Sequence, residues 1–156
     1  MNYLKHINTA LLLGGVSVSF GQSQSQPTAV KQKNVLMILV DDLKPNLGCY
    51  GDKAAISPNI DKLSQMGIRF NKSYCNQAVS VASRYNLTLG SRSTSTGLYN
   101  FGLEFRDVYP DAVTLPQFFM KAGYSAEAIG KVFHVGHGNT NDEASWSIPH
   151  FKEKVI

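Results

Sequence analysis

The chain has 156 residues, of which 43% are hydrophobic and 17% are charged, and its 15 basic and 11 acidic residues give a formal net charge of +4. This balance is typical of a globular domain and excludes a disordered, collagen-like or coiled-coil protein. Two cysteines, Cys49 and Cys75, are too few for a disulfide framework and too far apart for a zinc cluster, and the sequence leaves open whether they pair. The scattered charges allow polyanion binding without requiring it, and we expect no nucleic-acid partner.

Residues 1–21 predict a cleaved secretory signal peptide. Lys5 and His6 precede an apolar run over residues 10–18, and the small residues Ser19 and Gly21 lie where a signal peptidase cuts. The run is too short to span a bilayer, so we expect a periplasmic or secreted protein without stable membrane insertion. Residues 22–33 begin with a Gln/Ser-rich stretch that is typical of a flexible linker, which leaves residues 34–156 as the folded part.

The folded part opens with a continuous apolar run over residues 34–40, which predicts a strand buried on both faces of a parallel sheet. A loop rich in Gly, Pro and Asn follows over residues 41–56. Ser57 and Pro58 then predict the start of a helix that ends at Gly67, and residues 68–70 are a short strand candidate.

A second helix is predicted further along the chain, where Thr114 and Gln117 form a capping box and Gly123 marks the end. Residues 124–129 follow as another strand. Strands and helices in alternation predict an α/β fold with a mostly parallel sheet, whose chemistry lies beyond the carboxyl ends of the strands. The strands are too few to complete a large sheet and residues 140–156 hold no closing helix, so we expect the N-terminal portion of a longer protein.

Asp41 and Asp42 directly follow the first predicted strand. Adjacent carboxylates on a rigid mount supply the oxygen ligands that a hard divalent cation requires, so these residues are candidate metal ligands. The alternative is a turn with a helix cap, in which aspartate is also common.

A second polar cluster covers residues 80–84. A helix that starts near Ser80 would place Arg84 one turn later on the same face, which is a suitable arrangement for binding an anion. The alternative is a surface helix capped by a serine.

The third cluster, Lys131 and His134, directly follows the strand predicted over residues 124–129. Lysine binds anions as a point charge, and histidine can transfer a proton near neutral pH. The alternative is an exposed polar loop. His137 and His150 read as ordinary surface histidines, and a zinc site built from them lacks a supporting carboxylate or cysteine.

These three clusters, in this order and spacing, resemble the type I sulfatases of the alkaline-phosphatase-like superfamily. The family signature would be Ser80-Val81-Ala82-Ser83-Arg84, with Leu87, Gly90 and Arg92 further along. Within the family the chain is similar to bacterial iduronate-2-sulfatases of the serine type. That likeness covers residues 34–149 and is carried by residues 76–79, 96–99, 114–119, 123–124, 130–134 and 145–147.

The resemblance implies an alkaline-phosphatase-like fold, with a mostly parallel sheet flanked by helices, and the hydrolysis of sulfuric esters in sulfated glycans. It implies that a radical-type maturation enzyme oxidises Ser80 to formylglycine, whose hydrate attacks the sulfur and then expels sulfate through its second hydroxyl. A calcium ion would be held by Asp41, Asp42 and residue 80.

Three further roles are implied by the resemblance. Arg84 would orient the formylglycine, Lys131 would hold a sulfate oxygen, and His134 would assist proton transfer or sulfate binding. The similarity to iduronate-2-sulfatases implies a 2-O-sulfated uronic acid as the substrate.

Several positions depart from the family pattern. Serine stands at position 80 where cysteine is usual, Ala82 replaces a proline, and Thr88-Leu89 stands where leucine and then threonine are usual. The family's remaining metal ligands and a second active-site lysine do not occur up to residue 156. We therefore expect the chain alone to be inactive and the whole protein to be a sulfatase. The alternatives are a phosphatase or phosphonate hydrolase of the same superfamily, and a noncatalytic glycan-binding remnant.

Overall fold

The computed structural model describes residues 32–151. The predicted signal peptide and most of the predicted linker lie outside these residues. Within the described residues, the part from Met37 onward forms one compact unit, and the helices belong to it. None of the helices within residues 32–151 has the length and apolar character that a bilayer span requires.

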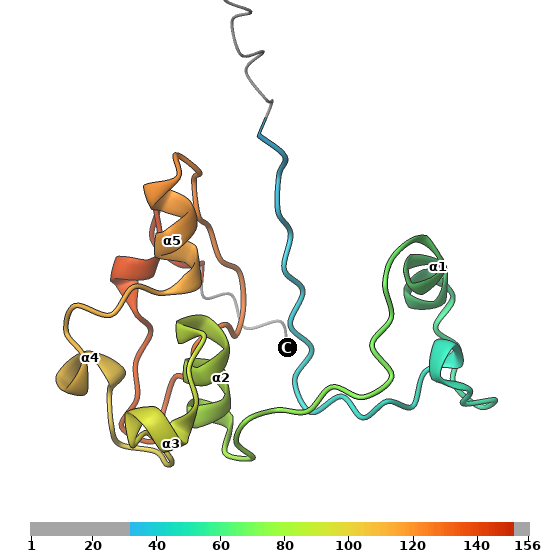
Figure 1. Cartoon of the computed structure of the whole chain (residues 1–156), viewed down its shortest axis with the longest axis horizontal. Coiled ribbons are helices and arrows are strands. Elements are labelled where there is room, and N and C mark those ends of the chain that lie inside the picture. The colour runs from blue at the N-terminus through green and yellow to red at the C-terminus, as the bar shows by residue number, and fades with distance from the viewer. Residues whose placement is uncertain (1–31, 152–156) are drawn as a thin grey trace, which may run out of the picture. The chain divides into compact units, whose positions relative to one another are not determined.

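In chain order the elements are the 3₁₀ helix η1, the α-helices α1 to α5 and the 3₁₀ helix η2 (Figure 1). Their bounds are η1 Gly48–Tyr50, α1 Pro58–Met66, α2 Ser80–Leu89, α3 Ser93–Thr96, α4 Phe105–Val108, α5 Leu115–Lys121 and η2 Glu143–Ser145.

The capping box predicted for α5 is confirmed. The Thr114 Oγ1 accepts a hydrogen bond from the Gln117 N–H at 3.4 Å, and the Gln117 Oε1 accepts one from the Thr114 N–H at 3.0 Å. Thr114 is fully buried, and its hydroxyl also contacts the Ser145 Oγ of η2 at 2.7 Å. The helix ends at Lys121, two residues before Gly123, whose φ is +87°.

Helix α1 has the predicted bounds but a different start from a simple serine cap. Ser57 occupies the cap position, yet its hydroxyl bonds no helix N–H group; it accepts from the Gly48 N–H and donates to the Asp61 Oδ1, both at 3.0 Å. The same carboxylate oxygen accepts from the Cys49 N–H at 2.7 Å. A Cβ atom at position 48 would lie too close to the Asp61 carboxylate, so any residue other than glycine would force the Asp61 side chain to shift. Both cysteines are free thiols.

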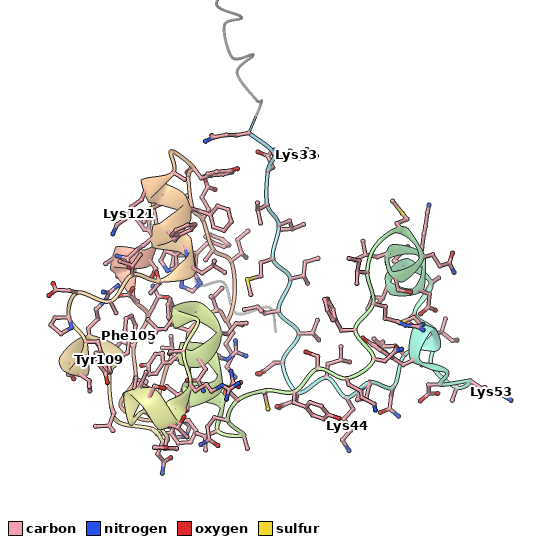
Figure 2. The ribbon with its side chains drawn as sticks, in the orientation of Figure 1. Lys33, Lys44, Lys53, Phe105, Tyr109 and Lys121 are labelled. Atoms are coloured by element: carbon pink, nitrogen blue, oxygen red, sulfur yellow. The ribbon has the colours of Figure 1, made fainter. Side chains whose placement is uncertain are left out.

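Helix α2 is a core helix, so the alternative of a surface helix with a serine cap is wrong. Its cap residue is Val79, and Ser80 is the first helical residue. Three large side chains pack around Tyr85 of α2: its ring lies 5.1 Å from Phe105 and 6.4 Å from Phe133, and Leu98 completes the group. Figure 2 shows Phe105 lying among the side chains beside α2, whereas Lys121 of α5 extends away from them.

The sheet predicted from the apolar runs is not formed within the described residues. Residues 34–40 belong to no ladder, and Ile38 and Val40 are 70% and 56% exposed. Residues 68–70 are likewise unpaired in this part of the chain. The physical reason is that a strand is stabilised by a neighbouring strand, and residues 32–151 offer residues 34–40 none.

Only the strand predicted over residues 124–129 finds part of a partner in the described region. The Ala126 carbonyl accepts from the Ser147 N–H at 2.8 Å, the Ala128 carbonyl accepts from the Phe151 N–H at 3.2 Å, and Ile129 and Phe151 form a parallel bridge. The direction of this pairing agrees with the parallel sheet that the sequence predicts.

The aromatic group around Tyr85 sets the stability of this unit. Replacing Phe105, 1% exposed, with alanine is expected to lower the free energy of unfolding by about 3–5 kcal/mol, because a large cavity would remain. Urea unfolding followed by circular dichroism measures the change. Phe118→Ala is the matched control, because that ring is 64% exposed. Equal losses in the two variants would contradict the assignment of the core.

Candidate anion and nucleophile site

The guanidinium of Arg84 joins three segments that are distant in sequence. Its Nε donates to the Ser80 Oγ at 3.3 Å, and its Nη1 donates to the main-chain carbonyls of Lys131 and Val132 at 2.7 and 3.2 Å. Its Nη2 forms an ion pair with the Asp41 Oδ1 at 2.6 Å. The side chain is 10% exposed, so its charge is largely removed from water and is compensated by these oxygen atoms. The three predicted clusters therefore meet at one residue.

The position of Ser80 follows from the geometry of α2. Because Ser80 and Arg84 are four residues apart, their side chains share one face of the helix, as the sequence predicts. Ser80 is half-buried and lies in the first turn, where backbone N–H groups lack helical partners and the helix dipole is positive. The Ser80 hydroxyl therefore lies close to two sources of positive charge, the start of α2 and the Arg84 guanidinium.

Asp41 is bound by two cationic side chains. Its Oδ1 accepts from Arg84, and its Oδ2 accepts from the Lys131 Nζ at 2.6 Å. The hydrogen bond from Lys131, followed by the hydrogen bond and charge of Arg84, holds the pKa of Asp41 below its ordinary value and outweighs the opposing effect of burial. Asp41 and Lys131 are each 44% exposed, so we expect their ion pair to contribute modestly to stability.

The neighbouring carboxylate, Asp42, is not part of this cluster in the described residues. Asp42 is exposed and has a positive φ of 51°, and its carboxylate forms no hydrogen bond or ion pair within residues 32–151. The two acidic residues therefore differ, although the sequence alone treats them as equivalent.

The calcium site that the resemblance implies is not assembled by the described residues. No group of three or more His, Cys, Asp or Glu side chains in this part of the chain is placed to hold a metal ion. Both oxygens of Asp41 already accept hydrogen bonds from cations. Ca²⁺ takes about six to eight oxygen ligands, more than Asp41, Asp42 and Ser80 could supply.

His134 lies on the same loop as Lys131 and is 8% exposed. Its Nε2 is 3.3 Å from the Nδ1 of His137, and the Phe101 ring packs 5.0 Å from each imidazole. Burial lowers the pKa of His134, and the charges of Lys131, His137 and Arg84 lower it further, against a smaller opposite effect of Asp41.

His137 and His150, which the sequence predicts to be ordinary surface histidines, have specific contacts. His137 is exposed as predicted, but it is bonded to His134, and a spacing of three residues was the only sequence signal of that contact. His150 is partly buried, with its Nε2 2.7 Å from the Gly130 carbonyl and its ring stacked on Trp146. His150 thus contacts the residue immediately before Lys131.

Together these groups can bind an oxyanion and exchange a proton with it. Arg84 and Lys131 supply positive charge, Ser80 supplies an oxygen at a helix start, and His134 supplies an imidazole that is largely neutral near pH 7. Groups of these types are used by enzymes that bind and cleave esters of oxyanions.

The sulfatase family model matches residues 33–153, and the chain belongs to the sulfatase family. Membership implies an alkaline-phosphatase-like α/β fold, of which the described residues contain helices and one short parallel pairing.

Among curated proteins the chain is similar to the iduronate 2-sulfatases of Mus musculus and Homo sapiens. It is 38% identical to the mouse protein over 148 residues, covering 93% of this chain and 27% of that protein. It is 41% identical to the human protein over 142 residues, covering 89% of this chain and 26% of that protein. A sulfatase of Formosa agariphila is 33% identical over 112 residues, covering 67% of this chain and 22% of that protein. The chain thus spans about a quarter of the length of these relatives.

The lowered pKa of His134 predicts a pH dependence of stability. Because the unfolded chain takes up a proton on this histidine near 6.5 and the folded chain only at lower pH, its contribution to stability is complete above 6.5 and falls as the pH drops. Urea midpoints measured across this range should fall less steeply in His134→Asn than in the wild type. Proton NMR titration should place the His134 midpoint below 6.5. A midpoint at or above that value would contradict the assignment.

Proposed function

We propose that the protein to which this chain belongs is a sulfuric ester hydrolase acting on sulfated glycans, at the 2-O-sulfate of a uronic acid. The observation that carries the proposal is the side chain of Arg84, which bonds the Ser80 hydroxyl, the main chain at Lys131 and the Asp41 carboxylate. Membership of the sulfatase family supports the reaction class. Sequence identity of 38% and 41% to two iduronate 2-sulfatases supports the choice of substrate.

In this proposal Ser80 is the precursor of formylglycine, produced by a radical-type maturation enzyme. Formylglycine would supply an aldehyde hydrate with two hydroxyls, one to attack sulfur and one to lose its proton and release the sulfate, whereas serine has only one hydroxyl. The environment of Ser80 is suited to it, since the Arg84 Nε already donates to the Oγ and the residue is only half-buried. Arg84 would keep that oxygen oriented throughout the reaction.

Lys131 and His134 have complementary parts in the proposal. The Lys131 ammonium is 44% exposed, so it can bind a sulfate oxygen while remaining close to Asp41. The lowered pKa of His134 keeps its imidazole neutral near pH 7, and a neutral imidazole can accept a proton from the nucleophile or share one with the sulfate.

Calcium belongs to the proposal through the chemistry of Asp41 and Asp42. Carboxylate oxygens are the ligands that a hard cation prefers, and bound calcium would add positive charge where the sulfate oxygens gather. Asp41, Asp42 and residue 80 would hold it, with the remaining ligands supplied from outside the described residues. We further propose a periplasmic or secreted location, no stable membrane insertion and no nucleic-acid partner.

The first test replaces Ser80 in the whole protein, produced together with a radical-type maturation enzyme. Ser80→Ala should lower sulfate release from a 2-O-sulfated uronic acid disaccharide on the order of 10⁶-fold, because no nucleophile remains. Ser95→Ala is the control, since Ser95 is exposed, lies outside the signature at residues 80–84 and its hydroxyl makes no hydrogen bond in the described residues. Mass spectrometry of the peptide carrying residue 80 should show the loss of two hydrogens in the wild type.

The same experiment separates the alternatives. Turnover by a protein whose Ser80 is unmodified would favour a phosphatase or phosphonate hydrolase. Retention on heparin without turnover or modification would favour a noncatalytic glycan-binding remnant.

The position of the sulfate is tested separately. Disaccharides that carry one sulfate at different positions should be cleaved at different rates, and we expect the highest kcat/KM for the 2-O-sulfated uronic acid. Equal rates, or a preference for a 6-O-sulfated hexosamine, would overturn this part of the proposal while the sulfatase assignment remained.

A further inference from the structure

The contact between His134 and His137 has no part in the function proposed above. The His134 Nε2 and the His137 Nδ1 are 3.3 Å apart, and the two ring centroids are separated by 5.6 Å. Phe101 packs against both rings at 5.0 Å. His134 is buried and His137 is exposed, so the pair connects the interior of the site to the solvent.

The loop that carries His137 is held in place by its neighbours. Gly136 and Asn139 form two main-chain hydrogen bonds with each other, at 2.9 and 3.0 Å. The Asn139 side chain accepts a hydrogen bond from the Gly102 N–H at 3.0 Å and donates one to the Leu103 carbonyl at 2.8 Å. His137 itself has a φ of +54°, which costs a non-glycine residue free energy. These bonds retain that backbone conformation and so fix the position of the imidazole beside His134.

The hydrogen bonds indicate which nitrogen of His134 carries the proton. The Nδ1 is buried and has no partner within the described residues, whereas the Nε2 faces the His137 Nδ1 at 3.3 Å, a nitrogen that can donate or accept. A buried N–H group without an acceptor is costlier than a buried lone pair without a donor. The neutral ring is therefore expected to carry its proton on Nε2 and to donate it to the His137 Nδ1.

We propose that His137 is a positioning residue for His134: it accepts the Nε2 proton and thereby holds the imidazole ring in place against Phe101. This inference rests on the proposed function, in which His134 handles a proton of the nucleophile or the sulfate. His137 acts through His134 and touches no reacting atom.

Two substitutions of His137 distinguish the effect of losing its hydrogen bond from the effect of straining the backbone. His137→Asn places an amide oxygen close to the position of the imidazole Nδ1, and asparagine tolerates a positive φ. His137→Gly removes the side chain without straining the backbone. The two variants therefore differ mainly in whether His134 retains its acceptor.

The decisive measurement is made by NMR on the ¹⁵N-histidine-labelled whole protein at alkaline pH. The wild type should show the proton on the His134 Nε2, protected from exchange with water. His137→Asn should keep that protection, and His137→Gly should exchange roughly tenfold faster, as expected for the loss of one hydrogen bond. His150 is an internal control for folding, because its Nε2 faces a carbonyl oxygen and must carry the proton in every sample.

A His134 proton on Nδ1 in the wild type would overturn the proposal without any variant. Equal exchange in the wild type and His137→Gly would also overturn it.

The role in the reaction is tested in the whole protein. His137→Gly should lower kcat about tenfold with little change in KM, and His137→Asn should restore it. Equal kcat in wild type and His137→Gly would overturn the positioning role. A wild type with no sulfatase activity but the expected His134 proton would overturn the proposed function instead, and would leave the assignment of the hydrogen bond standing.

Discussion

The bonds of Arg84 determine how the site is put together. Its partners at Asp41, Lys131 and Val132 lie 43, 47 and 48 residues away in sequence, whereas Ser80 lies one helical turn away. A guanidinium has five N–H donors in a fixed plane, so one side chain can address four oxygen atoms in different directions. Lysine, with a single nitrogen on a flexible stem, could not hold the same arrangement. Arg84 thus fixes the position of the candidate nucleophile relative to Asp41 and to the loop carrying Lys131.

Helices α1 and α5 were predictable because their signals are local. The capping box at Thr114 and the proline at position 58 act within one turn, and the structure contains helices that start there. The predicted sheet depends instead on partners distant in sequence. Residues 34–40 have the composition of a buried strand but no neighbouring strand within the described residues, whereas residues 124–129 show a short pairing with Phe151.

The same distinction applies to the site. The shared face of Ser80 and Arg84 follows from helical periodicity and was predicted from their spacing. The pairing of Asp41 with Lys131, 90 residues apart, could not be predicted, because it depends on how the chain folds back. The sequence also gave no reason to separate Asp41 from Asp42, which a positive φ distinguishes in the structure. The calcium ligands and the catalytic roles remain predictions.

The contacts between η1 and α1 have a consequence for the order in which the chain folds. Asp61 binds the Cys49 N–H and the Ser57 hydroxyl across only 12 and four residues, so this pair closes short loops at small entropic cost. The contacts of Arg84 with Asp41 and Lys131 close far longer loops and are slower to form. The segment between Asp41 and Ser80 can thus form its own helices before Asp41 reaches the Arg84 guanidinium. Fewer flexible residues then remain to be ordered when the contact between Asp41 and Arg84 forms.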